Sequence, residues 1–473
     1  MDKDVLIHEM TERFQELYAQ ALGVLEEAPD GEWISASEHA FRDVFQQLLT
    51  ESYEAALKDK VERHPTADRA AFSPRDNPTV RLRNKGSHPV SVLTACGNVE
   101  LHRRYFWSKA MGGVYPADKS LGIDDHCVSV GAAELCALMG ALQGFDKGCW
   151  ALEKTAGLRV SKERLRQITE REGEQVQRLR REGALTPTWT ADQAAETPHG
   201  PSRVYVGADG VMVRTVTQQE KEKRRKNHAI RRRQRGRAGL GNTKPLPPFR
   251  AGSDQAFKEM KVGIFYDQSK CHVHAFATEK NSEGFGLLLK SQAEQLKFQD
   301  ADEKISLTDG GPWIRNQFLE HLKYLDAMLL DFYHLSGHIW ETARCCLGQG
   351  QEADTWAKDQ LSEIKHVGAR SVIDAIDTLA TRFRAHAKQE SLRQLKQYII
   401  QRWEMVEYPQ ALARGWDIGS GPTEAMCKNL TLRLKRTGMK WDQVHAAGMM
   451  NLVALQESGQ WDQYWRTRTR PAA

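Results

Sequence analysis

Three acidic residues suggest the chemistry of this chain. Asp209 interrupts the apolar, β-branched run 204–213, and Asp309 ends a second short apolar run. Glu424 follows a glycine-rich stretch at the start of a segment that we expect to be helical. A carboxylate inside a buried strand is unfavourable unless something pairs with it, and a metal ion is one such partner. We therefore expect Asp209, Asp309 and Glu424 to meet in space and to bind divalent cations.

The type of ligand indicates the type of reaction. Carboxylate oxygens suit Mg²⁺ or Mn²⁺, and two such ions about 4 Å apart can promote an in-line displacement at phosphorus. One ion would activate a water or a 3′-hydroxyl, and the other would stabilise the leaving oxygen. The expected chemistry is cleavage or transfer of a phosphodiester, with two metal ions as cofactors.

Each of the three acids also has an ordinary explanation. Asp209 and Asp309 both precede glycine, which is typical of turns. Glu424 is a favourable acid for the first turn of a helix. The order strand, strand, helix makes the three together more specific than any one of them.

The segments around the aspartates predict the sheet that would position them. The runs 261–266, 272–277 and 305–308 have the pattern of strands, and 285–296 has that of an amphipathic helix. Residues 339–408 are almost wholly helix-forming and contain no catalytic pattern. We expect an α/β fold, with a mixed-sheet core, an all-helical insertion and a mainly helical N-terminal region.

Positive charge is concentrated in two segments of the sequence. Between Glu220 and Arg250 there are about a dozen Lys and Arg residues, in a segment (218–256) that we interpret as a basic loop between two strands. After Glu424, two lysines recur on one helical face. Such residues can bind DNA by releasing counterions, although a charge run can also be a solvated loop. The candidate DNA contacts are Arg224, Arg225, Lys226, Arg231, Arg232, Arg233, Lys428, Arg433, Lys435 and Arg436.

The N-terminal part predicts a second DNA-binding region. Residues 1–85 carry helical apolar stripes, and 86–185 contain a β-hairpin followed by a segment that resembles a helix-turn-helix. A glycine turn and a serine N-cap separate the two helices. Arg164 and Arg166 lie near the start of the second helix, where a recognition helix would face the major groove. The alternatives are a solvated strand face and an ordinary helical hairpin.

Composition limits the class of protein. The 473 residues, 40% hydrophobic and 27% charged, suffice for roughly three domains with apolar cores. The net charge of +5 is modest, so a nucleic-acid signal depends on where the charge lies. No apolar run approaches the roughly 18 residues of a membrane span, and no signal peptide is evident. The eight cysteines are scattered, which indicates neither a zinc ribbon nor a disulfide framework. We expect a reduced, cytoplasmic protein.

These motifs together resemble the DDE transposases of bacterial insertion sequences, and most closely the ISKra class. The matching motifs are 207–210, then 308–310 with Trp313 and Ile314, then 418–424 with Lys428, Arg433, Lys435, Gly438, Met439 and Trp441. The resemblance covers about 205–455 and is most specific at 418–424. It implies an RNase H-like catalytic core in which the two aspartates and Glu424 are the catalytic and metal-binding residues. Asp331 and His334 are similar to an Asp/Cys-x-x-His element of related transposases, which implies a supporting role.

The resemblance also implies a function and partners. The expected enzyme is a DNA transposase that binds the terminal inverted repeats of an insertion sequence, cleaves the strands and transfers them to target DNA. Its partners would be double-stranded DNA and further copies of itself, in the cytoplasm of a bacterium near the nucleoid. The alternatives are a transposon-derived DNA-binding protein that no longer cuts, and an RNase H-like nuclease without strand transfer.

The expected organisation follows the motifs. It comprises an N-terminal helical region (1–85), the hairpin and helix-turn-helix region (86–185), the first part of the catalytic core (203–338), the helical insertion (339–408) and the last part of the core (409–473). The stretch 186–202, rich in Thr, Pro and Ala, is interpreted as a linker.

Overall fold

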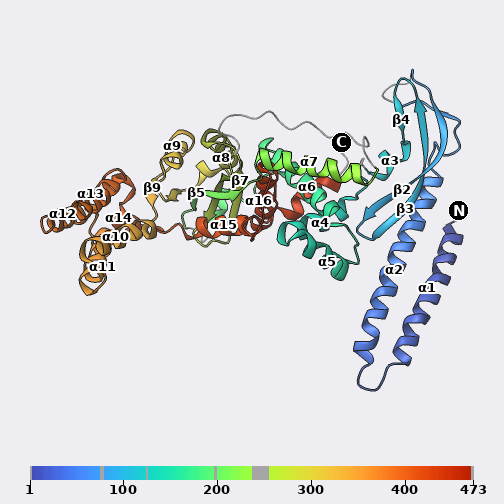
Figure 1. Cartoon of the computed structure of the whole chain (residues 1–473), viewed down its shortest axis with the longest axis horizontal. Helices are drawn as coiled ribbons and strands as arrows, with labels where there is room; N and C mark the ends of the chain where they lie inside the picture. Colours follow the sequence, from blue (N-terminus) through green and yellow to red (C-terminus); the bar gives the residue numbers. More distant parts are fainter. Residues whose placement is uncertain (1–2, 75–78, 124–125, 196–199, 237–254, 470–473) are drawn as a thin grey trace. The chain divides into compact units, whose positions relative to one another are not determined.

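The computed structural model describes residues 3–74, 79–123, 126–195, 200–236 and 255–469 (Figure 1). They form a mixed α/β protein with two β-sheets and many helices, as the sequence predicted at this level. The chain divides into two compact units, residues 1–169 with 467–473 and residues 170–466. We call them the N-terminal unit and the central unit.

The division between the units differs from the linker that the sequence indicated. It falls at residues 169 and 170, inside a helix, and not in 186–202. In that stretch, Trp189, Ala191 and Ala194 are buried in the core of the central unit. Composition rich in Thr, Pro and Ala is typical of a linker, whereas the apolar residues of this stretch that the structure describes pack into the core around the sheet.

The N-terminal unit combines helices with an antiparallel sheet. Its elements are α1 (Lys3–Glu26), α2 (Trp33–Glu62), β1 (Ala71–Phe72), β2 (Leu82–Thr94), β3 (Gly97–Ser108), β4 (Gly112–Val114), α3 (Pro116–Leu121), α4 (Val130–Leu142), α5 (Phe145–Ala156) and the beginning of α6 (Lys162–Arg181). The sheet has the order β1-β2-β3-β4. The predicted hairpin is therefore present as β2 and β3, and it is longer than the sequence suggested. The helix pair α5 and α6 lies where the helix-turn-helix was expected, with Gly157 in the left-handed conformation between them.

The central unit contains the second sheet and most of the helices. Its elements are the end of α6, η1 (Ala191–Ala194), β5 (Arg203–Arg214), α7 (Gln218–Gln234), β6 (Phe257–Asp267), β7 (Val273–Thr278), α8 (Ser282–Leu296), η2 (Phe298–Asp300), β8 (Glu303–Thr308), α9 (Pro312–His321), β9 (Ala327–Leu330), α10 (Phe332–Leu347), α11 (Gln351–His366), α12 (Ala369–Ala380), α13 (His386–Ile400), η3 (Trp403–Met405), α14 (Tyr408–Ala413), α15 (Gly421–Leu432), α16 (Gln443–Glu457) and α17 (Trp461–Thr469), which ends in the N-terminal unit.

Strand β5 is the centre of the five-stranded sheet, whose order is β7-β6-β5-β8-β9. It pairs antiparallel with β6 and parallel with β8. A central strand is covered on both faces, which explains why β5 is an almost continuous apolar run. One face packs on α8 and α9 through a core that includes Val206, Phe265, Phe276, Phe285 and Phe318. Helix α15 packs on the other face of the sheet, against β5.

The helices α10 to α14 form a helical group beside β9 (Figure 1). Their buried residues make a core of their own, which includes Leu335, Ile339, Ile376 and Leu395. The predicted all-helical insertion is thus helical, and it begins at Phe332, a few residues earlier than expected. Among the helices that the structure describes, none is long and apolar enough to cross a membrane.

The basic segment 218–256 is a correction to the sequence analysis. Residues Gln218–Gln234 form a helix with no buried residue, and not a loop. Thr217 and Glu220 make a capping box that starts this helix, which offsets the repulsion among its cations. Lys221 binds Asp442 at 2.5 Å, and Lys440 pairs with Glu220. The rest of the expected loop, 237–254, lies outside the described residues.

Candidate active site

Asp209 lies in the middle of the central strand. It is half-buried on β5, and the backbone N–H of Gly210 donates a hydrogen bond of 2.6 Å to its Oδ1. Burial raises the pKa of the Asp209 carboxyl, and the nearby Asp309 carboxylate raises it further. The Gly210 N–H and the Cys427 thiol act in the opposite direction. Asp209 is therefore an acid whose negative charge is disfavoured by its surroundings, as expected for a carboxylate that needs a cation.

The parallel pairing of β5 and β8 brings Asp309 to Asp209. The register aligns Tyr205 with Ile305 and Val206 with Ser306. Continued beyond the ladder at the same offset, this register places Asp309 beside Asp209. Asp309 itself follows the last residue of β8 and begins a tight turn, in which its Oδ1 accepts a hydrogen bond of 2.8 Å from the N–H of Gly311. The turn fixes the direction of the carboxylate.

Glu424 lies in the first turn of α15, as the sequence predicted. This helix packs closely on β5 because residue 207 is glycine. A Cβ on Gly207 would lie 2.0 Å from Oγ1 of Thr423, so any larger residue would push α15 away. The side chain of Glu424 is exposed, and it lines a hollow of about 380 Å³ together with Asp209. Lys428 and Lys435 line the same hollow.

Asp209 lies near Asp309 and near Glu424, but the three carboxylates do not form a preformed metal site in the described residues. Asp209 acts electrostatically on Asp309 and shares the hollow with Glu424. Asp309 does not line that hollow. Within the described ranges, no group of three or more His, Cys, Asp or Glu side chains is arranged to hold a metal ion. The structure thus places Asp309 and Glu424 each near Asp209.

Asp331 connects the elements that carry Asp309 and Glu424. It is buried, caps α10 by accepting a hydrogen bond from the N–H of Tyr333 at 3.0 Å, and accepts another from the hydroxyl of Ser420 at 2.8 Å. Its own N–H donates to the carbonyl of Thr308 at 2.7 Å. One residue therefore ties the end of β8 to the segment that starts α15. Its supporting role is structural positioning of the two acids.

A cluster from the helical group lies against the Asp309 turn, and the sequence analysis missed it. The hydroxyl of Tyr398 donates to the carbonyl of Asp309 at 3.3 Å, and the guanidinium of Arg402 stacks on the Tyr398 ring at 3.9 Å. His338 packs on the same ring, with 4.3 Å between ring centroids. His334 is exposed and lies 5.2 Å from His338 between ring centroids. No sequence signal marked Tyr398 and Arg402, because they are separated from Asp309 by most of the helical group.

Cys427 is a further residue that the sequence analysis missed. It follows Glu424 by three positions, so it lies on the same helical face and lines the same hollow. Burial raises the pKa of its thiol well above the usual range, and the Asp209 carboxylate raises it further. Cys427 is therefore a neutral thiol beside Asp209. The helical spacing from Glu424 could have identified it.

The predicted DNA contacts fall into exposed and buried groups. On α7 the predicted contacts are exposed except Arg232, which is partly buried, and Lys428 and Lys435 are exposed as well. Arg433 is buried and stacks on Trp441 at 5.0 Å, so its assignment as a DNA contact is corrected to a packing residue. Arg164 donates to the carbonyls of His126 and Cys127 at 3.0 and 2.9 Å, which makes it a structural residue as well.

The remaining two candidate contacts, Arg166 and Arg436, are partly buried. Arg166 forms an ion pair with Glu163 one turn earlier on α6, and such a surface pair contributes little to stability. Arg436 is half-buried just beyond α15. Neither position by itself indicates a nucleic-acid contact.

Comparison with protein-family models and with curated proteins gives no match. The chemistry of the donor set is therefore the test of the expected cofactor. Three carboxylates supply only oxygen ligands, which are those that Mg²⁺ and Mn²⁺ prefer. Burial is the main cause of the raised pKa of Asp209, the Asp309 carboxylate adds to it, and a bound cation would oppose both effects. The three residues fit a hard divalent cation in the type of their ligand atoms, whereas in the described part of the chain they are not arranged as a group that could hold one.

Proposed function

We propose that the chain is a DDE-type DNA transposase that cleaves DNA strands at the ends of an insertion sequence and joins them to target DNA. The observation that carries this proposal is that Asp209 on the central strand β5 lies close to Asp309 at the end of the neighbouring strand β8, and that Glu424 lines the same hollow as Asp209. The resemblance of the three motifs to these transposases supports the same conclusion. The mixed sheet around β5 is compatible with the RNase H-like core that the resemblance implies.

Asp209, Asp309 and Glu424 would hold Mg²⁺ or Mn²⁺. When bound, these ions supply a more acidic water or 3′-hydroxyl and stabilise the leaving oxygen. The chain's own residues bind and orient the substrate. Lys428 and Lys435 line the hollow beside Glu424, where their ammonium groups can hold a phosphate on either side of the cleaved bond.

The proposed partners follow from the charge of α7. Its exposed cations include Arg224, Arg225, Lys226, Arg231 and Arg233, and Arg232 beside them is partly buried. Ion pairs with Asp442 and Lys440 fix the first turn of α7 to the segment that follows α15. This arrangement supports contact between α7 and the backbone of the same DNA that reaches the hollow. We further propose that copies of the chain act together on paired DNA ends, within the bacterial cytoplasm.

One observation favours a second candidate function. The three carboxylates do not form a ready-made metal site in the described part of the chain. A transposon-derived protein that binds DNA without cutting would have no need of one. This candidate differs from the first in a single measurable property, which is metal-dependent cleavage.

The test is cleavage of a DNA fragment that carries the element's own ends, with Mg²⁺ or Mn²⁺. Asp209→Asn, Asp309→Asn and Glu424→Gln should each reduce cleavage by more than about a hundredfold, because even residues that only support metal ligands cost 10–100-fold. Glu320→Gln, an exposed acid on α9, is the matched control and should cut like the wild type. A gel shift must show that all variants still bind the ends. Wild-type protein that binds the ends and never cuts with either metal would establish the second candidate instead.

A further inference from the structure

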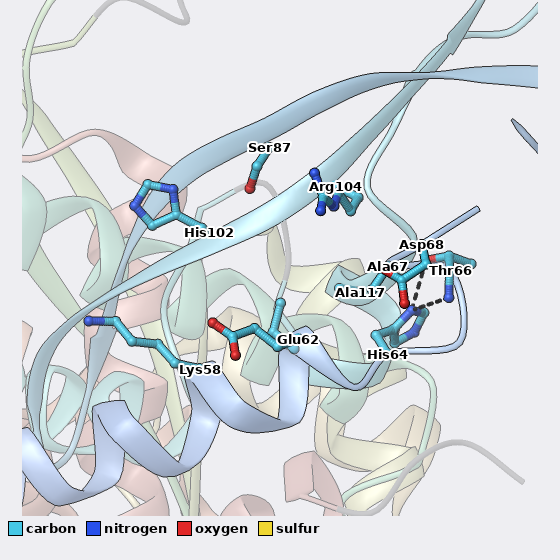
Figure 2. Close-up of a pocket in the computed structure, with 11 residues that line it drawn as sticks. Lys58, Glu62, His64, Thr66, Ala67, Asp68, Ser87, His102, Arg104 and Ala117 are labelled. Atoms are coloured by element: carbon cyan, nitrogen blue, oxygen red, sulfur yellow. Dashed lines mark hydrogen bonds between the residues drawn. The ribbon is translucent and has the colours of Figure 1, made fainter. Parts of the chain in front are cut away.

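The N-terminal unit contains a second hollow, far from the acids in sequence. It has a volume of about 410 Å³ and lies between the end of α2 and the strands β2 and β3. Figure 2 shows Lys58 and Glu62 on α2 at one side of it, and Ser87, His102 and Arg104 on the strands opposite. The buried apolar residues Val61 and Ala117 form part of its lining, and most of the other lining residues are polar or charged. A concave site with convergent polar groups can bind and orient a polar ligand.

Some polar groups around this hollow are already satisfied. The ammonium of Lys58 binds Glu54 at 2.5 Å, and Glu54 also accepts from the N–H of Glu100. His64 is held by the hydroxyls of Thr66 and Ser120, at 2.8 and 3.2 Å. These groups form the walls and carry no unsatisfied charge.

The other charged or ionisable side chains of the lining are exposed to solvent and have no protein partner among the described residues. Within the residues that the structure describes, Glu62, Asp68, His102 and Arg104 make no side-chain hydrogen bond and no ion pair. A carboxylate and a guanidinium thus face one hollow without reaching each other. Arg104 alone would suit a phosphate, but Glu62 would repel one. The ligand that satisfies both must present hydrogen-bond acceptors on one side and donors on the other.

Among nucleic-acid bases, guanine has this distribution. Its O6 and N7 are two adjacent acceptors, which match the fork of an arginine. Its N1–H and N2 amino group are two adjacent donors, which match a carboxylate. We propose that the hollow binds a guanine base, with Arg104 donating to O6 and N7 and Glu62 accepting from N1 and the N2 amino group. The imidazole of His102 supplies a flat face on which the base can stack.

The site requires a guanine that is not base-paired. In duplex DNA cytosine occupies the N1 and N2 groups, so Glu62 would find no donor. The ligand is a guanine in a single strand or in a free nucleotide, and the experiment distinguishes these sources. The inference goes beyond the proposed transposase function and does not depend on Asp209, Asp309 or Glu424.

The test measures binding of labelled oligothymidine that carries one central guanine or one central adenine. Full-length protein without divalent metal avoids cleavage of the probe, and fluorescence anisotropy reports the affinity. We expect the guanine strand to bind about tenfold tighter, because a good bidentate contact discriminates at least to this extent. Arg104→Ala and Glu62→Gln should each remove the preference. Arg83→Ala, an exposed arginine on β2 that does not line the hollow, is the matched control.

Base analogues assign each contact. A 7-deazaguanine lacks the N7 acceptor, and hypoxanthine lacks the N2 amino group. The first should weaken binding by wild type and have no further effect in Arg104→Ala. The second should weaken binding by wild type and have no further effect in Glu62→Gln. Equal affinity for guanine and adenine strands, or analogue penalties that both variants retain, would overturn the proposal.

Two additions keep the test decisive. If Arg104→Ala fails to fold, Arg104→Lys retains the charge and removes the fork, and it should lose the guanine preference while its thermal unfolding matches wild type. Guanosine monophosphate is added as a competitor. Displacement of the strand by micromolar nucleotide assigns the hollow to free guanine nucleotides, and displacement only by guanine-containing strands assigns it to single-stranded nucleic acid.

Discussion

At the scale of single residues, Asp209 is the candidate site residue whose charge most clearly lowers the stability of the folded protein. Its pKa is raised by burial and by Asp309, so the folded protein holds the proton of Asp209 more tightly than the unfolded chain does. The charged carboxylate therefore costs stability once the pH exceeds the ordinary value of 3.8, and the cost is complete above the raised pKa. A carboxyl group with such a perturbed pKa is a candidate for a functional residue.

We therefore expect Asp209→Asn to raise the melting temperature of the protein at pH 7. The amide keeps the Oδ1 acceptor for Gly210 and removes the charge, and each kcal/mol gained corresponds to a few degrees. The gain should disappear below about pH 3.8, where the wild-type carboxyl is protonated in both states. Mg²⁺ or Mn²⁺ should raise the melting temperature of wild type and not that of the variant. Thermal unfolding of wild type and variant over a range of pH, with and without Mg²⁺ or Mn²⁺, measures the gain, its pH dependence and the metal response. A variant less stable than wild type at pH 7 would contradict the argument.

At the scale of elements, the approach of α15 to β5 depends on Gly207. Gly207→Ala should lower stability by about 1–3 kcal/mol and reduce cleavage, because the new methyl group meets Thr423 and moves the helix that carries Glu424. Thr423→Ala removes the atoms in conflict, so the double variant should recover most of both losses. Gly337→Ala is the control: nothing lies within 4 Å of its Cβ, and alanine in helix α10 should stabilise by about 0.5–1 kcal/mol. Denaturant unfolding and end cleavage are the measurements.

The helix α7 gives a second prediction at this scale, which rests on the proposed function. Changing Arg231, Arg232 and Arg233 together to glutamine should weaken DNA binding and lower the slope of log affinity against log salt by about 2–3, because each lost phosphate contact contributes about 0.9. Arg433→Gln should leave that slope unchanged and lower stability, since its guanidinium is buried on Trp441. The measurement is the DNA affinity of both variants and of the wild type over a series of salt concentrations. An equal change of slope in both variants would contradict the prediction, because it would mean that the buried Arg433 contacts DNA as much as the arginines of α7 do.

The elements also show what the sequence could and could not predict. Strands β5, β6 and β8 were predictable because a short apolar run bounded by turn residues is typical of a buried strand. The place of Glu424 was predictable because an acid is favourable in the first turn of a helix. For α7 the charge run indicated exposure, and exposure does not determine backbone conformation; the Thr217 and Glu220 pair was the better signal. The burial of Arg433 depends on Trp441, which only the folded chain brings to it. The contact of Tyr398 with Asp309 also depends on the tertiary fold, so the sequence did not indicate it.

At the scale of the whole molecule, the two hollows belong to different compact units and share no residue. Variants at sites without shared partners have additive effects. Glu62→Gln should therefore remove the preference for guanine and leave the metal-induced rise in melting temperature as in wild type. Asp209→Asn should remove the metal response and leave the guanine preference. The double variant should show both losses at the sizes of the single variants. Anisotropy and thermal unfolding on the same four proteins test this, and a guanine preference that changes with Asp209→Asn would show that the two units are coupled.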